Sequence, residues 1–96
     1  MSNLESFDLN YLLLNGAKVT RECYFIMSMI RSSQFYDCEG PIESQEKADK
    51  IVRERRELGR ECHWQFGIYE VEFKGFTYRF DNETRRMIKQ SAVSVH

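Results

Sequence analysis

The chain has 96 residues, and its 14 basic side chains nearly balance its 15 acidic ones, so the formal net charge is -1. This balance excludes a global field that would attract nucleic acid or anionic lipid. The hydrophobic share of 42% and the aromatic share of 14% are enough to build a packed core and exclude general disorder. We predict a single compact domain over residues 1–96, with residues 91–96 frayed.

The location of the protein is inferred from three sequence features. The longest apolar stretch, Tyr24 to Ile30, is far shorter than the roughly 20 residues that span a bilayer. The N-terminus lacks the basic and apolar regions of a secretory signal. Cys23, Cys38 and Cys62 are an odd number without close pairing, which is typical of reduced thiols. We therefore expect a cytoplasmic protein with no membrane segment.

The first two elements are predicted as a helix and a strand. Over residues 3–15 apolar side chains recur at spacings of three and four, with Asn3 as a possible cap and Gly16 as a stop, so we predict a short helix. Residues 19–30 are rich in β-branched and aromatic side chains, and we predict a central strand. A buried helix is the alternative there, because a short apolar run fits both structures.

A loop and a second helix follow. Residues 31–41 contain Ser, Asp, Gly and the only Pro, so they are predicted to be the main connection. Ser44 then suits an N-cap, an apolar stripe runs at helical spacing, and Gly59 suits the end, which predicts a helix over residues 45–58. Opposite charges four residues apart predict a salt-bridged, solvated outer face for this helix.

Residues 62–80 are predicted to form a β-hairpin. Lys74-Gly75 makes a two-residue turn in which Gly supplies a positive φ. The alternation of apolar residues changes phase beside Gly67, which indicates a β-bulge. The register separates an apolar from a charged face, and its opposed pairs are Phe73 with Phe76, Val71 with Tyr78, Tyr69 with Phe80, Glu72 with Thr77, and Glu70 with Arg79.

The last element and the fold class complete the structural prediction. Asp81 or Asn82 can cap a final helix, because apolar residues follow at helical spacing. The predicted fold class is α+β, in the order α-β-α-β-β-α, with a small sheet of about three strands and helices packed against it. Such a sheet leaves one face uncovered, so a homo-oligomer is a further expectation.

No constellation for catalysis or metal binding is found in the sequence. The cysteines and His63 lack the CxxC or HxxxH spacing of zinc sites, and adjacent Cys62 and His63 point to opposite faces of a strand. Neither Cys38 nor His63 lies in a thiol-enzyme signature. The five glycines are dispersed, so a phosphate-binding loop is not expected. We predict no catalytic residue, no metal site, no cofactor and no enzymatic activity.

The strongest candidate for partner binding is the loop aromatic pair Phe35-Tyr36, framed by Arg31 and Asp37. Aromatic and Arg side chains are enriched in interface hot spots, so these four residues are the predicted partner-binding site. The alternative is that both rings fold back over the sheet as a lid. Trp64 is a second candidate anchor, although a strand Trp in an apolar alternation is commonly part of a core.

Recognition of nucleic acid or nucleotides is the alternative function. In that hypothesis the sheet aromatics stack on bases and four arginines contact phosphate, namely Arg55, Arg56, Arg85 and Arg86. Acidic residues interleave with the basic ones over residues 43–60, which makes a basic binding stripe less expected than a protein partner.

Element order also suggests a resemblance. An aromatic strand, Gly40-Pro41, a helix of mixed charge and Gly67-Ile68-Tyr69 in a closing strand resemble small uncharacterised accessory proteins of phages and other mobile elements. The resemblance implies a protein that binds and inhibits or redirects a larger host machine, and no functional residue is carried over from it. Our leading prediction is a non-enzymatic binding protein that modulates or inhibits a larger protein partner.

Overall fold

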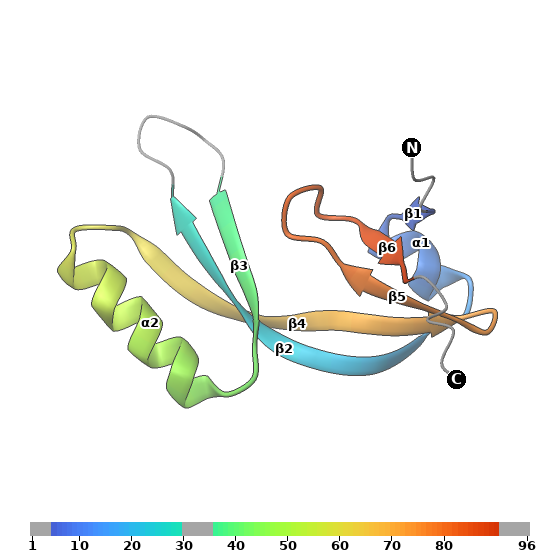
Figure 1. Ribbon diagram of the computed structural model, residues 1–96, viewed down its shortest axis with the longest axis horizontal. Helices are drawn as coiled ribbons and strands as arrows, with labels where there is room; N and C mark the ends of the chain where they lie inside the picture. The colour runs from blue at the N-terminus through green and yellow to red at the C-terminus, as the bar shows by residue number, and fades with distance from the viewer. Residues whose placement is uncertain (1–4, 30–35, 91–96) are drawn as a thin grey trace, which may run out of the picture. The chain divides into compact units, whose positions relative to one another are not determined.

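The computed structural model describes residues 5–29 and 36–90 (Figure 1). These residues form six strands and two helices, and hydrogen bonds join the strands in the order β1-β6-β5-β4-β2-β3. The fold is therefore mostly antiparallel sheet. The prediction of an α+β fold with about three strands, helices packed against them and the order α-β-α-β-β-α is wrong. The extra strands come from segments that were expected to be loop or helix.

The helices are α1 (Leu9–Leu14) and α2 (Gln45–Glu57). The chain divides into two compact units, which we call the hairpin unit (Met1–Arg21 and Ile68–His96) and the helix unit (Glu22–Gly67). Strands β2 and β4 contribute residues to both. The strands are β1 (Ser6–Phe7), β2 (Lys18–Met29), β3 (Tyr36–Ile42), β4 (Cys62–Phe73), β5 (Phe76–Phe80) and β6 (Met87–Lys89).

The hairpin unit contains the predicted turn at Lys74-Gly75. Both residues have positive φ angles, 51° and 82°, as a type I′ turn requires. This turn fixes the register of β4 against β5. Four predicted pairs are confirmed, namely Phe73 with Phe76, Glu72 with Thr77, Val71 with Tyr78, and Glu70 with Arg79.

The apolar face of this hairpin forms the core of the hairpin unit. Phe7 packs edge-on against two of its rings, with centroids 6.3 Å from Phe73 and 5.6 Å from Tyr78. Burial raises the pKa of Tyr78, as expected for a phenol removed from water. The buried residues of this core are Leu12, Val71, Phe73, Tyr78 and Met87.

The final helix predicted after Asp81 or Asn82 is wrong. The Asp81 carboxylate does accept hydrogen bonds from the backbone N–H and the hydroxyl of Thr84, both at 2.8 Å, so the capping signal is real. The turn stops at Arg85, whose φ of 60° is left-handed, and the chain then enters β6. Met87, with 0% exposure, joins the core as a strand residue. Residues 91–96 lie outside the described part of the chain.

The first helix is shorter than predicted. Asp8 caps it by accepting from the Asn10 N–H at 2.8 Å, and α1 covers six residues rather than residues 3–15. Ser6 and Phe7 instead form β1, which pairs with β6. Tertiary pairing with a C-terminal strand thus overrides the local helical spacing. Residues 1–4, including Asn3, lie outside the described part.

The helix unit confirms the central strand and the second helix. Over the described part of residues 19–30 the chain forms strand β2, so the alternative of a buried helix is wrong there. Ser44 caps α2 by accepting from the Lys47 N–H at 3.2 Å, and Gly59 follows with a φ of 83°. The helix packs against β2 and β4, and the buried residues of this core are Ile26, Ala48, Val52 and Cys62.

Strand β3 corrects the predicted loop of residues 31–41. Its residues from Tyr36 onward pair with β2, and residues 30–35 lie outside the described part. Gly40, which suggested a turn, serves a packing purpose: a Cβ there would lie 2.7 Å from Phe25 Cδ1. Tertiary contact with an aromatic ring therefore explains a glycine inside a strand.

The change of phase in the apolar alternation of β4, beside Gly67, coincides with the boundary between the two units. Cys62 and Trp64 belong to the core of the helix unit, whereas Val71 and Phe73 belong to the core of the hairpin unit. Even-numbered residues at the start of β4 therefore pack in one core, and odd-numbered residues at its end pack in the other. The β-bulge at this place stays a prediction.

Candidate functional site

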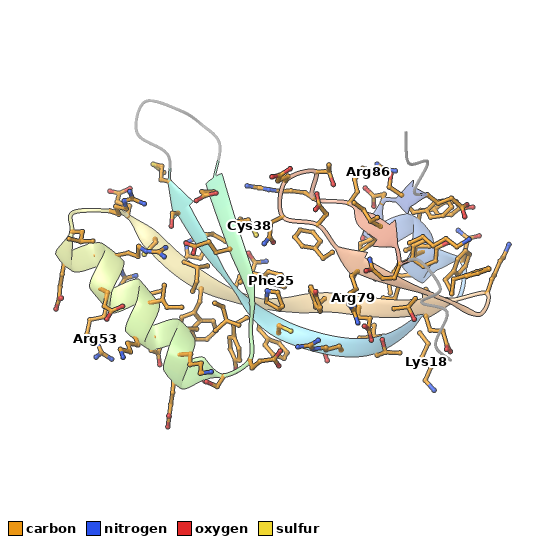
Figure 2. The ribbon with its side chains drawn as sticks, in the orientation of Figure 1. Lys18, Phe25, Cys38, Arg53, Arg79 and Arg86 are labelled. Carbon is orange, nitrogen blue, oxygen red and sulfur yellow. The ribbon has the colours of Figure 1, made fainter. Side chains whose placement is uncertain are left out.

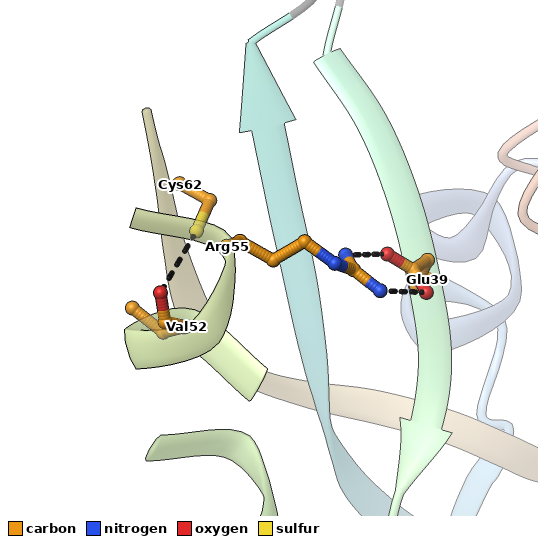
Figure 3. Close-up of polar contacts among 4 residues, drawn as sticks. All are labelled: Glu39, Val52, Arg55 and Cys62. Carbon is orange, nitrogen blue, oxygen red and sulfur yellow. Dashed lines mark hydrogen bonds and ion pairs between the residues drawn. The ribbon is translucent and has the colours of Figure 1, made fainter. Parts of the chain in front are cut away.

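The described residues contain no group of three metal-ligating side chains. Cys23, Cys38 and Cys62 are unpaired thiols, and all three are buried. The Cys62 Sγ lies 3.6 Å from the Val52 carbonyl oxygen, to which it donates (Figure 3). The thiols contribute to packing.

Within residues 5–29 and 36–90, no helix is long and apolar enough to cross a membrane.

Two of the four predicted partner-binding residues, Tyr36 and Asp37, fall at the start of β3. Arg31 and Phe35 lie outside the described residues. The backbone of Tyr36 opposes Met29 of β2, and the exposed Asp37 opposes Ser28. At least part of the expected loop is therefore a strand, and the loop site stays a prediction.

Two of the predicted phosphate-binding arginines are held by the helix unit. The Arg55 guanidinium forms a two-pronged ion pair with Glu39 of β3, with Nη2 donating to Oε1 at 3.1 Å (Figure 3). This pair raises the pKa of Arg55 and lowers the pKa of Glu39. The Arg56 Nε and Nη2 donate to the Cys62 carbonyl at 3.2 and 3.0 Å. Both arginines thus have structural partners.

The other two arginines lie in the hairpin unit. The Arg86 Nε donates to Ser6 Oγ at 3.1 Å, and its Nη2 donates to the Ser6 carbonyl at 3.2 Å. Arg85 is exposed in the left-handed position of the turn. Arg86 therefore holds β1 beside β6, and a phosphate contact would have to compete with these bonds.

A different set of residues lines a surface depression on α2 in the helix unit. One side of α2 faces the beginning of β4: Asp49 accepts from the Trp64 indole N–H at 2.7 Å, and Arg56 reaches Cys62. Between these two contacts is a surface depression of about 470 Å³. It is lined by Asp49, Val52, Arg53, Arg56 and Glu57. The depression therefore follows the side of α2 that lies along β4.

The β4 edge beside this depression is open among the described residues. Strand β5 pairs with β4 only from Glu70 to Phe73, so the residues from Cys62 to Gly67 have β2 as their one strand neighbour in the described chain. The Glu61 carbonyl accepts from the Met29 N–H of β2 at 3.0 Å. The next carbonyl, that of Cys62, accepts from Arg56 instead.

Backbone groups of successive strand residues point to opposite edges. Because the Glu61 carbonyl points to β2 and the Cys62 carbonyl points to α2, the N–H and C=O groups of Trp64 and Phe66 are expected to point to the open edge. An open edge of this kind is a template for another strand. The residues that line the depression all belong to α2, and two of them, Asp49 and Arg56, contact this strand at Trp64 and Cys62.

Three aromatic rings of β2 and β4 pack together in the helix unit. The ring of Tyr24 lies 5.1 Å from that of Trp64 and 4.9 Å from that of Phe66, measured between centroids. Trp64 is fixed by its hydrogen bond to Asp49, whereas Phe66 is 51% exposed. Phe66 therefore stays half-exposed beside the Tyr24 ring, and a side chain held by a neighbour loses little entropy when it is covered.

The expected salt-bridged face of α2 is not found within the described helix. None of the expected pairs at a spacing of four is an ion pair; these pairs are Glu46 with Lys50, Asp49 with Arg53, and Arg53 with Glu57. Asp49 binds Trp64 instead. Figure 2 shows Arg53 projecting from α2, where it lines the depression.

Sequence reasoning considered Trp64 but missed Phe66, Arg53 and the open edge. A signal for the edge was present in the predicted register. With a turn at Lys74-Gly75, a strand that ends at Phe80 cannot reach the first residues of a strand that begins at Cys62.

Comparisons with protein-family models, with curated protein sequences and with solved structures found no match to this chain.

Proposed function

We propose that the protein is a non-enzymatic binding domain that takes an extended segment of a larger protein as an added strand on the open edge of β4. The observation that supports this proposal is the edge of β4 from Cys62 to Gly67, which has β2 as its one strand neighbour in the described chain. Strand addition supplies affinity through main-chain hydrogen bonds and specificity through side-chain pockets. The open edge of β4 offers main-chain groups, and the half-exposed ring of Phe66 offers apolar area for a side chain.

This mode of binding agrees with the action of a modulator or inhibitor in the cytoplasm. A domain that captures an extended segment changes its partner by occupying that segment, without chemistry of its own. The resemblance to accessory proteins of phages and mobile elements points in the same direction. A homo-oligomer remains compatible, since a second copy can also offer a strand to an open edge.

The test is a selection of linear peptides. A display library of random ten-residue peptides is selected on the protein, and enriched peptides are then measured on Phe66→Pro and Phe66→Ala. Proline removes the backbone N–H of residue 66, which is expected to point to the open edge. The fold tolerates a proline at such an edge position because no hydrogen bond between strands of the sheet is lost. Alanine removes only the ring. Thermal melts of both variants check that they fold.

We expect Phe66→Ala to weaken binding by up to about tenfold, the size of one aromatic contact. Phe66→Pro is expected to abolish binding, because the added strand loses a main-chain bond and is displaced by the proline ring. Failure to enrich any peptide, or equal binding to the proline and alanine variants, would show that the edge is not the binding site.

A further inference from the structure

The open edge of β4 is a short ladder of backbone groups. From Cys62 to Gly67 this edge has β2 as its one strand neighbour in the described chain. The Cys62 carbonyl already accepts from Arg56, so Trp64 and Phe66 are the residues expected to offer both an N–H and a C=O to an added strand. A strand added here can therefore form four main-chain bonds.

Two copies of this ladder are complementary to each other. In an antiparallel pair with a two-fold axis at Gln65, Trp64 of each copy opposes Phe66 of the other. Residues that exchange both of their backbone bonds alternate in such a pair with residues that exchange none. Trp64 and Phe66 then make all four bonds, and the two Gln65 residues oppose each other without a backbone bond. Each copy uses the same surface, as in most protein dimers.

The side chains agree with this register on both faces of the strand. Trp64 and Phe66 pack against the same Tyr24 ring, and Phe66 is 51% exposed. Opposed residues in an antiparallel pair have Cβ atoms about 4.5–5.5 Å apart, so Trp64 of a second copy would cover the exposed ring of Phe66. On the other face the exposed Gln65 meets its own copy, and one amide can donate to another and accept from it.

Charge does not oppose the approach of a second copy. The formal net charge of the chain is -1, and a net charge near zero favours self-association. The side of α2 that lies along β4 carries two arginines and two carboxylates around its depression, namely Asp49, Arg53, Arg56 and Glu57. A surface with this balance can meet its own copy without net repulsion.

Resting on the same open edge as the proposed function, we infer that a second copy of the chain occupies this edge as an antiparallel strand, with the two-fold axis at Gln65. Four main-chain bonds and two aromatic contacts make a small interface, so the dimer is weak and depends on concentration. A partner segment uses the same backbone groups of Trp64 and Phe66. The dimer and the partner complex therefore exclude each other.

The test traps the dimer by a disulfide at the axis. Gln65→Cys places two thiols on opposed residues whose Cα atoms are about 4.5 Å apart, which is within the range of a disulfide. His63→Cys is the matched control on the same face of the strand. The two copies of residue 63 lie four residues apart along the paired strands, about 13 Å, which is too far for a disulfide.

Both variants and the wild-type protein are oxidised with diamide and compared on non-reducing gels, and the wild-type protein gives the background from the three native thiols. Mass spectrometry of the digested dimer locates the crosslink. Thermal melts check that each variant folds. A third variant combines Gln65→Cys with Phe66→Pro, because the proline removes an N–H of the ladder.

We expect Gln65→Cys to give at least about tenfold more crosslinked dimer than His63→Cys, because thiols held in place react at a far higher effective concentration than thiols that meet by collision. Phe66→Pro should reduce this yield to that of the control. Equal yields at residues 65 and 63, or a yield that the proline leaves unchanged, would overturn the inference.

The inference and the proposed function can fail separately. If residues 65 and 63 crosslink equally while selected peptides still lose binding on Phe66→Pro, the edge takes a partner segment and no second copy. If the dimer is trapped but no peptide is enriched, the second copy is supported and the edge is excluded as the site of a partner segment. A selected peptide that leaves the yield of the Gln65→Cys dimer unchanged would contradict the competition between the two.

Discussion

The two halves of β4 differ in how their edges are used. In the hairpin unit, the residues from Glu70 to Phe73 pair with β5, and Arg79 of β5 lies 2.9 Å from the Glu70 carboxylate. In the helix unit, the residues from Cys62 to Gly67 have β2 as their one strand neighbour in the described chain. One half of the strand is closed by its own hairpin, and the other half contacts α2 through Cys62 and Trp64. The same strand thus has a paired edge in one unit and, among the described residues, an unpaired edge in the other.

The largest expected effect comes from placing a charge in each core. Val71 and Ile26 both have 0% exposure, one in each unit, so Val71→Asp and Ile26→Asp bury a carboxylate without a partner. We expect each to cost about 4 kcal/mol or more of the free energy of unfolding. Thermal melts followed by circular dichroism measure this loss. A variant that keeps the wild-type melting temperature would show that its core is dispensable.

A smaller effect is expected at the turn that closes the hairpin. No atom lies within 4 Å of a Cβ added to Gly75, so the cost of Gly75→Val comes from its φ of 82°. A β-branched residue at positive φ costs about 1 to 3 kcal/mol. Lys74→Asn is the matched control, because Asn-Gly is the favoured pair for this turn, and it should be neutral or stabilising. Equal melting temperatures for the two variants would contradict the turn type.

In the helix unit, two glycines that touch the same ring should respond differently. A Cβ at Gly40 would lie 2.7 Å from Phe25 Cδ1, whereas one at Gly67 would make ordinary contact at 3.7 Å with Phe25 Cε2. We expect Gly40→Ala to destabilise by about 1 to 3 kcal/mol through overpacking. Gly67→Ala should be neutral or stabilising by up to about 1 kcal/mol, because a strand glycine is entropically costly. Chemical denaturation of both variants distinguishes the two sites.

The smallest effects concern one ion pair in each unit. Bonds from Arg55 lower the pKa of Glu39, and bonds from Arg79 and Thr20 lower that of Glu70. Each carboxylate therefore binds its proton more weakly in the folded than in the unfolded state. The contribution of each ion pair to the free energy of unfolding is present above the ordinary carboxyl pKa of 4.5. This contribution is lost as the pH falls through the lowered pKa of the folded state.

Glu39→Gln and Glu70→Gln should each reduce the acid dependence of stability, by a few tenths to about 1 kcal/mol. Glu70 is the less exposed side chain, at 18% against 40% for Glu39, so its substitution should have the larger effect. Denaturation from pH 7 to pH 3 measures both. Wild-type acid dependence in Glu70→Gln would mean that its ion pair with Arg79 does not persist in solution.

The sequence by itself determined the elements that depend on local chemistry. Ser44 and Gly59 bound the helix between them because a cap and a left-handed residue act within one turn of chain. Lys74-Gly75 fixed the register of the hairpin because a two-residue turn leaves one alignment of its strands. The apolar run of β2 likewise identified a central strand.

Only the tertiary structure decided the rest, because those segments depend on partners far away in the chain. Ser6 and Phe7 form a strand through β6, and Gly40 lies in β3 because the ring of Phe25 occupies the space of a side chain. The capping signal at Asp81 gave a single turn, since Met87 reaches the core as part of a strand between β5 and β1. The position of α2 beside β4 arises in the same way. Arg56 and Asp49 meet Cys62 and Trp64 only after α2 has crossed β2, and no local propensity encodes that crossing.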